Sequence, residues 1–240
     1  MREERGKQDT PPQKKTKRQN QQKEINILES ALKVFGEKGF EATTVSAISK
    51  EAGISEPTLY EYFDSKEDVL FSIPALYTRR EVERMKEVEH YIHSPSEKIR
   101  MIIQSYLEFY ERNPLYTSVA LLTLKGSRNF MKSPAYEAVR EAARSIVTVF
   151  NEGVAQGVFR DDIDGYLVRN MVLGFIEHLT IQWLLTGRPQ RISEYRDIMH
   201  EMVMRAIEKE DEDGVEVKLR IEGMNIPSGK RRDDEPEGLS

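Results

Sequence analysis

The sequence predicts an all-α protein, with a three-helix helix-turn-helix domain at residues 23–70 and a larger helical domain at residues 71–209. Two observations lead to this prediction. Between Thr44 and Lys66, capping residues, a glycine and apolar spacings are arranged as in two short helices joined by a tight turn. From residue 94 onward, apolar residues recur at helical spacing, and Gly or Pro residues mark the breaks.

Composition narrows the class of protein. The chain has 240 residues, which is enough for one large or two modest domains. It contains no cysteine, so disulfides and thiolate metal sites are excluded. The polar, basic start lacks the apolar run of a signal peptide, and no stretch approaches the roughly 18 apolar residues of a membrane helix. We therefore expect a cytoplasmic protein with no membrane partner.

The first residues, 1–22, are rich in Lys, Gln, Pro and Arg and almost free of apolar residues, which predicts a disordered basic arm. One interpretation of this arm is a solubilising tail. The first helix follows at residues 24–38, where Ile25, Leu28, Leu32 and Phe35 share one face. Gly39 is expected to end this helix as a C-cap.

The helix-turn-helix has five diagnostic positions. Thr44 and Ser55 are expected N-caps, since each hydroxyl can accept a backbone N–H of the helix that follows. Gly53 can adopt the positive φ of the turn without a Cβ clash, and Ser49 is small enough to let two helices cross closely. Pro57 fits the first turn of the second helix, where a missing N–H costs little. The residues expected to face the core are Val45, Ile48, Ala52, Ile54, Leu59 and Phe63.

A helix-turn-helix places its second helix in the major groove, so these positions indicate DNA binding. The alternative is a buried helical hairpin in an unrelated bundle. The coincidence of two caps, a small residue, a glycine turn and the aromatic end Tyr60, Tyr62 and Phe63 favours DNA binding. A second interpretation of the basic arm follows, in which it lies on phosphates or enters the minor groove.

The charge of the domain argues against strong non-specific binding. The formal net charge of the chain is −5, and residues 21–70 hold five lysines against ten carboxylates. Non-specific affinity for DNA comes from neutralising phosphates, so the domain alone has little of it. The arm, with Lys17 and Arg18, is expected to compensate.

Residues 31–70, ALKVFGEKGFEATTVSAISKEAGISEPTLYEYFDSKEDVL, resemble the DNA-binding domain of the tetracycline-repressor (TetR) family of regulators. The resemblance rests on Phe35, Gly39, Thr44, Gly53, Ser55, Leu59, Tyr60, Tyr62, Phe63, Ser65 and Lys66. Two positions depart from the family pattern: Ser49 replaces the usual alanine, and Pro57 stands where glycine or a polar residue is commoner. A base preference therefore cannot be transferred from a relative.

The resemblance implies a homodimer that binds a palindromic double-stranded DNA operator. It places Lys66 on the DNA backbone, and the free N–H groups of a helix N-terminus favour phosphate independently. The start of the second helix is expected on base edges, and the tyrosines on phosphates. The full set of predicted DNA contacts is Thr44, Ser55, Glu56, Pro57, Thr58, Tyr60, Tyr62 and Lys66, with Lys17 and Arg18 of the arm.

A helix that starts at Ser65, with an imperfect capping box formed by Asp68, leads out of the first domain. Its charged part, residues 79–89, is expected to connect the domains, and in TetR-like proteins this helix swings the DNA-binding head when ligand binds. The remaining helices are expected from near Ser96 to Asn113, at 115–124, from Pro134 to Gln156, at 166–186 and at 192–207, with a loop at 125–133 and a disordered charged tail at 210–240.

Residues 166–186 are apolar on more than one face, so this helix must be covered on two sides. In TetR-like proteins the last two large helices pair with those of a second subunit as a four-helix bundle. The resemblance therefore implies that residues 166–186 and 192–207 form a dimer interface. The alternative is a helix that is central to one monomer.

The second domain also holds side chains that can line a cavity for a small-molecule effector, because ligand sites are usually apolar with few polar groups. The candidates are Tyr106, Tyr110, Phe130, Met131, Phe175, His178 and Trp183. The alternative for each of them is core packing. Residues 107–160 also resemble TetR-family members that respond to fatty acids or acyl-CoA, which implies an apolar or amphipathic effector.

An enzyme is disfavoured, since the sequence has no phosphate-binding glycine loop, no nucleophile elbow and no cysteine. No catalytic residue, cofactor or metal site is expected, and His90 and His93 are interpreted as surface histidines. The sequence thus predicts a ligand-responsive repressor. The alternative is a helix-turn-helix protein whose helical domain binds a protein partner and no ligand, which a fully packed second domain would favour.

Overall fold

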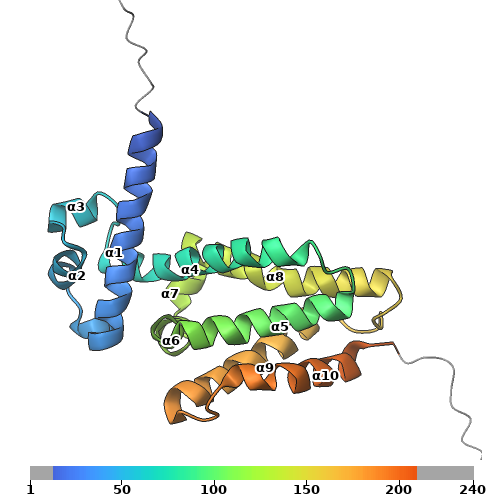
Figure 1. The fold of residues 1–240 in the computed structure, drawn as a ribbon. Coiled ribbons are helices and arrows are strands. Elements are labelled where there is room, and N and C mark those ends of the chain that lie inside the picture. The colour runs from blue at the N-terminus through green and yellow to red at the C-terminus, as the bar shows by residue number, and fades with distance from the viewer. Residues whose placement is uncertain (1–12, 210–240) are drawn as a thin grey trace, which may run out of the picture. The chain divides into compact units, whose positions relative to one another are not determined.

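The computed structural model describes residues 13–209 (Figure 1). Over this range the chain folds into α-helices with one π-helical and one 3₁₀ segment, which confirms the predicted all-α class. None of the described helices is long and apolar enough to cross a membrane. The elements are α1 (Gln13–Ala42), α2 (Val45–Ala52), α3 (Glu56–Tyr60), α4 (Lys66–Glu89), α5 (Pro95–Arg112), α6 (Pro114–Ser118), the π-helix η1 (Val119–Leu124), α7 (Arg128–Lys132), α8 (Pro134–Ala155), α9 (Gly165–Thr186), the 3₁₀ helix η2 (Ile192–Tyr195) and α10 (Arg196–Ile207).

Helix α1 differs from the prediction at its start. It begins at Gln13, whereas the arm was expected to continue to residue 22, so Lys17 and Arg18 lie on the helix. Gly39 interrupts the helix near its other end, with non-helical φ and ψ of 76° and 166°. Residues 1–12 of the predicted arm and the predicted tail at 210–240 lie outside the described residues.

Helix α4 leads from the helix-turn-helix unit into the larger domain (Figure 1). Its start forms half of the expected capping box, because Ser65 Oγ accepts the Asp68 N–H at 3.1 Å. The Asp68 carboxylate reaches one residue further back and accepts the Asp64 N–H at 3.1 Å. Helix α4 packs on both α1 and α8, and α5 packs on α8 and α10. The same helix therefore belongs to the core of the DNA-binding unit and to the wall of the second domain.

The segment at 125–133, expected as a loop, contains the short helix α7. Ser127 caps it by accepting the Phe130 N–H at 3.2 Å. Phe130 is buried, with its ring 5.5 Å from that of Phe71 in α4 and 5.3 Å from that of Tyr136 in α8. The helix forms because one aromatic side chain in an otherwise polar segment reaches the core. A single buried side chain produces no periodic pattern in the sequence, so the helix was not predicted.

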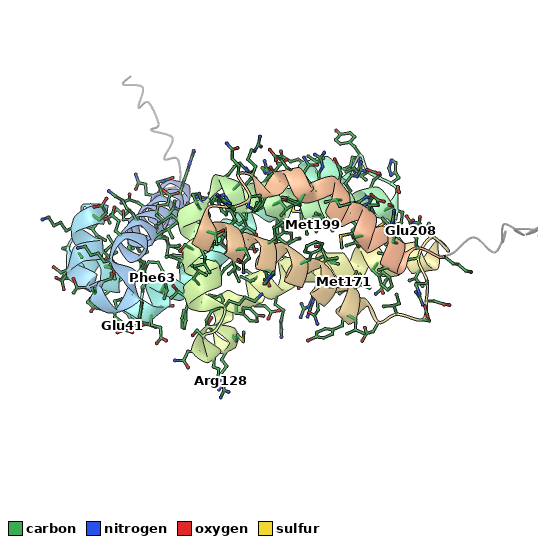
Figure 2. All side chains as sticks on the ribbon, turned by 90° about the horizontal axis from the view of Figure 1, so that it is seen from below. Glu41, Phe63, Arg128, Met171, Met199 and Glu208 are labelled. Carbon is green, nitrogen blue, oxygen red and sulfur yellow. The ribbon has the colours of Figure 1, made fainter. Side chains whose placement is uncertain are left out.

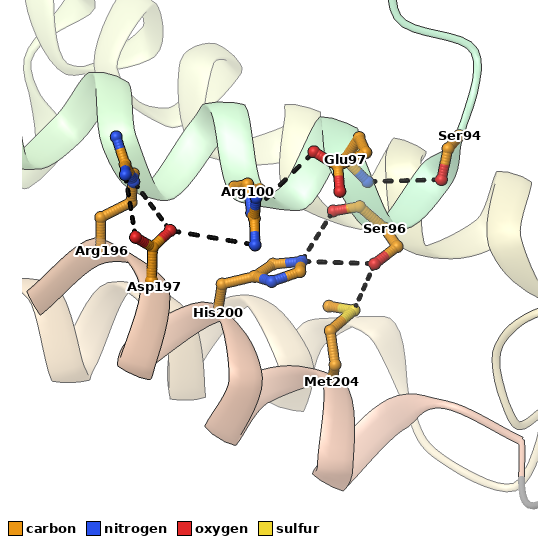
Figure 3. A network of polar contacts seen from close by, with 8 residues as sticks. All are labelled: Ser94, Ser96, Glu97, Arg100, Arg196, Asp197, His200 and Met204. Carbon is orange, nitrogen blue, oxygen red and sulfur yellow. Dashed lines mark hydrogen bonds and ion pairs between the residues drawn. The ribbon is translucent and has the colours of Figure 1, made fainter.

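A polar network fastens α10 to the first turn of α5 (Figure 3). His200 is only 7% exposed, and its Nε2 lies 3.0 Å from the Ser96 carbonyl oxygen. The Ser96 hydroxyl lies 3.3 Å from the same nitrogen and donates to Met204 Sδ at 3.0 Å. Asp197, one turn earlier on α10, lies 3.8 Å from Arg100. This histidine is therefore a partnered core residue that holds two helices together.

Candidate functional site

The helix-turn-helix has the local geometry that its residue types predict. Thr44 Oγ1 accepts a backbone N–H of α2 at 3.1 Å, and Ser55 Oγ accepts the Thr58 N–H at 3.3 Å. Gly53 adopts the left-handed conformation, with φ 68° and ψ 32°, and its N–H donates to carbonyls at the end of α2. Ser49 is 2% exposed, as a close helix crossing requires. These contacts fix the angle at which α3 leaves α2.

The outer face of this unit carries most of the predicted DNA contacts. Glu56 and Pro57 at the start of α3 are exposed, and Tyr60 at its end is 52% exposed. The hydroxyls of Ser55 and Thr58 lie 2.9 Å apart, so the cap engages both of them. Thr44, Lys17 and Arg18 are also exposed, the last two on the first turns of α1.

Tyr62 and Lys66 are placed differently from Tyr60. Tyr62 is half-buried and packs against the apolar core, where it lines a groove between α1 and α4. Lys66 Nζ donates to the Phe40 carbonyl at 2.8 Å and to the Thr43 carbonyl at 2.9 Å, and it lies 4.3 Å from the centre of the Phe40 ring. Lys66 thus ties the connection between α1 and α2 to the start of α4. One of its three N–H donors remains for a phosphate.

Replacing Lys66 by methionine should lower the free energy of unfolding by about 1–3 kcal/mol, because two carbonyls lose a charged donor while the aliphatic stem is kept. Thermal unfolding of the full chain measures this, and Lys50→Met is the control, since Lys50 is exposed on α2. A Lys66→Met protein that melts like the wild type but binds DNA more weakly would show that Lys66 acts on phosphate alone.

A cavity of about 520 Å³ lies between α4, α5 and α8, within the size range of ligand sites. It includes Tyr106 and Tyr110 of the seven predicted pocket residues. Its apolar wall is formed by Val82, Met85, Tyr106, Phe109, Tyr110, Tyr116, Ala138, Val139, Ala142 and Val149. The lining also includes charged side chains of α4 and α8.

Three tyrosines gather on the α5 side of this cavity. Burial raises the pKa of Tyr106 to about 12, and burial raises the pKa of Tyr110 and of Tyr116 as well. The Tyr116 ring stacks on Tyr77 of α4, with ring centres 4.6 Å apart. The hydroxyls therefore stay protonated at neutral pH and can donate hydrogen bonds to a neutral acceptor such as a carbonyl.

The other five predicted pocket residues do not line this cavity. Phe130 is packed between α4 and α8 as described above, and Met131 is 49% exposed on α7. Phe175, His178 and Trp183 all lie on α9, which forms no part of the cavity wall. The sequence-based prediction missed Tyr116, Val139 and the α4 residues, since residues 79–89 were expected to form a charged connection between the domains. Phe175 and Trp183 are instead partly buried against the core.

Helices α9 and α10 expose several apolar side chains on their outer faces. On α9 the inner face is buried through Val168, Val172, Ile176 and Thr180, which confirms that the helix is apolar on more than one side. The outer stripe, at helical spacing, holds Leu167, Met171, Gly174, His178, Gln182 and Leu185, and α10 adds Ile198 and Met202. Figure 2 looks onto this side, where Met171 marks α9 and Met199 marks α10. These two helices are the ones that the sequence predicts as the dimer interface.

Across residues 13–209, no group of three or more His, Asp or Glu side chains is arranged to hold a metal ion. His90 is the C-cap of α4 and His93 lies beyond the helix, so the two do not share a helix face.

Comparison with known proteins matches both parts of the chain. The family model for bacterial regulatory proteins of the tetR family matches residues 27–73, and the model for the C-terminal region of YsiA-like proteins matches residues 78–206. The fatty acid metabolism regulator protein of Bacillus subtilis is 24% identical over 190 residues, which cover 79% of this chain and 98% of that protein. The transcriptional repressor KstR2 of Mycolicibacterium smegmatis is 27% identical over 185 residues, covering 75% and 85%.

A solved structure shares the fold. The transcriptional regulator FadR of Bacillus subtilis, in complex with stearoyl-CoA, superimposes with a TM-score of 0.70 at 23% identity. The superposition covers 75% of this chain and 97% of that one. The two chains thus have the same arrangement of helices.

Proposed function

Because the chain belongs to the tetR family of bacterial regulatory proteins, we propose that it is a homodimeric repressor that an acyl-CoA releases from a palindromic operator. Its relatives of known role are transcriptional regulators. The observation that carries the sensor role is the cavity between α4, α5 and α8. The alternative, a ligand-free domain that binds only a protein partner, predicts a fully packed interior at this place.

On DNA, the two α3 helices of the dimer enter successive major grooves about one helical turn apart. Thr44, Tyr60, Tyr62 and Lys66 hold phosphates, and Lys17 and Arg18 at the start of α1 extend the contact. Ser55, Glu56, Pro57 and Thr58 approach base edges, where the Glu56 carboxylate accepts from a cytosine amine and the Thr58 methyl meets a thymine methyl.

The effector class follows from the cavity wall together with the relatives. The apolar wall of the cavity suits an acyl chain, and the neutral hydroxyls of Tyr106, Tyr110 and Tyr116 suit a thioester carbonyl, which carries no charge. The Bacillus subtilis relative regulates fatty acid metabolism by name, and the FadR structure contains stearoyl-CoA.

The link between the two sites is α4, which lines the cavity and also packs on α1. A ligand that fits the cavity better at one position of α4 favours the dimer shape with the corresponding head spacing. If that spacing does not match the operator, ligand and DNA favour different shapes of the dimer. Ligand binding then shifts the population away from the shape that binds DNA.

The test measures operator release by long-chain acyl-CoA. DNA selected by the protein from random duplexes supplies a fluorescent operator, and palmitoyl-CoA is titrated into the complex. We expect the operator affinity to fall at least tenfold, which corresponds to about 1.4 kcal/mol of coupling free energy. An operator complex that withstands saturating acyl-CoA of every chain length would refute the acyl-CoA effector and favour the protein-partner alternative.

A further inference from the structure

A second cavity, of about 590 Å³, lies in the groove between α1 and α4 on the DNA-binding unit. Its floor is apolar, with Ile25 and Leu28 of α1, Leu76 of α4 and the ring of Tyr62. Its charged lining includes basic groups from both helices, Lys17 from α1 and Arg79 and Arg80 from α4, beside one carboxylate from each helix. An apolar floor under basic groups fits a ligand portion that is both flat and anionic.

The two cavities meet at α4. Arg79 and Glu83, one helical turn apart, line both of them, so these two side chains form the ridge between the cavities. The tyrosine side of the first cavity lies near this ridge, because Thr78, the neighbour of Arg79, lines that cavity together with Tyr116. A ligand whose polar middle sits at the tyrosines therefore leaves the first cavity beside Arg79.

Positively charged side chains near the ridge between the two cavities can bind an anion. Arg80 is already paired with Glu29 at 2.8 Å. By contrast, neither Arg79 nor Lys17 forms an ion pair with any residue between 13 and 209. Two carboxylates, Glu24 and Glu83, also line the second cavity, so its selectivity depends on where phosphates sit relative to Arg79. Guanidinium groups bind phosphate with paired, charge-assisted hydrogen bonds.

We propose that the second cavity binds the phosphorylated nucleotide head of the acyl-CoA whose acyl chain fills the first, and that Arg79 is the specificity-determining residue for that head. This inference rests on the proposed function. A cavity of about 520 Å³ accommodates the chain and the thioester, so the phosphates and the adenine must lie outside it. The Tyr62 ring offers an aromatic surface on which a base stacks.

The same geometry connects ligand binding to release. Lys17 and Tyr62 line the second cavity and are also predicted DNA contacts. A bound nucleotide head draws both side chains toward the groove between α1 and α4. The ligand head then competes with the operator for these residues, in addition to any movement of α4.

The test compares two probes that differ by the phosphorylated nucleotide head, which consists of the phosphates, the ribose and the adenine. Palmitoyl-CoA carries the thioester and the nucleotide, whereas S-palmitoyl-pantetheine keeps the thioester and has no phosphate. Affinities are measured by calorimetry on the full chain, on Arg79→Ala and on the control Arg84→Ala. The Arg84 side chain lies on the same helix and lines neither cavity, and its ion-pair partner Glu81, at 2.8 Å, keeps a second pair with Arg112 at 3.3 Å.

The wild type should bind palmitoyl-CoA at least tenfold more tightly than S-palmitoyl-pantetheine. Arg79→Ala should lose about tenfold in affinity for palmitoyl-CoA, the order expected for a hydrogen-bonded charge pair, and none for the pantetheine thioester. Arg84→Ala should keep both affinities. Equal affinities in the wild type, or an equal loss for both probes in Arg79→Ala, would overturn the inference while leaving the acyl sensor intact. Binding of neither probe would overturn the proposed effector and the inference with it.

Discussion

A chain with glutamate at both Leu167 and Met171 should run as a monomer and lose operator binding by a factor of about 10²–10⁴. The two side chains are 60% and 38% exposed on the outer stripe of α9. In a two-fold symmetric interface the same patch meets itself, so each substitution places two like charges in an apolar contact. A monomer contacts only one half-site of the operator. In a dimer, binding of the first head raises the effective concentration of the second head at the other half-site, and the monomer loses this gain in affinity.

Sedimentation velocity and operator titration measure the two effects on the same preparation. The control is Val88→Glu, which changes an apolar side chain of 52% exposure near the end of α4. The control should remain dimeric and bind DNA normally. A Leu167→Glu, Met171→Glu chain that stays dimeric would place the interface elsewhere, and a monomer with full affinity would show that pairing is not needed for DNA binding.

Replacing Tyr60 by alanine should weaken operator binding by a factor of about 10–100, without changing the oligomeric state. The side chain is 52% exposed at the end of α3, and its hydroxyl is proposed to donate to a phosphate. Hydrogen bonds to charged groups contribute about 1.5–3 kcal/mol, which corresponds to this range of affinity. Fluorescence anisotropy with the selected operator provides the measurement.

Tyr91→Ala is the matched control for this substitution, because Tyr91 is a more exposed tyrosine, at 78%, just beyond the end of α4. Its loss should leave operator affinity unchanged. If Tyr60→Ala bound the operator as tightly as the wild type, α3 would not be the element that docks on DNA. Because Tyr60 is largely exposed, the variant should unfold at nearly the same temperature as the wild type, which separates a lost contact from a lost fold.

The sequence by itself determined the local structure of this protein, namely its helix caps, its turns and the ends of its helices. Thr44, Gly53 and Ser55 act on backbone groups within a few residues of themselves, so their roles follow from residue type and spacing. The helix breaks at Asn113 and Gly187 follow in the same way. The two-sided apolar character of residues 166–186 was likewise visible, because the periodicity of one helix is contained in one stretch of chain.

The position of the first helix boundary needed the folded chain. Residues 13–22 have no apolar face of their own, and composition predicted disorder there. In the structure they extend a helix that is already anchored by its buried face, and extension of an existing helix needs no new nucleus.

The roles of single polar and aromatic side chains were decided only by the tertiary structure. Lys66 donates hydrogen bonds to carbonyls more than twenty residues away in the sequence, and no feature of its own helix predicts those partners. Tyr116 lines the cavity while Trp183 does not, since the cavity wall is made where α6 meets α4, α5 and α8, and α9 takes no part in it. The period of a helix shows which residues turn inward. Which inward residues leave space between them depends on contacts between segments far apart in the sequence, and only packing fixes those contacts.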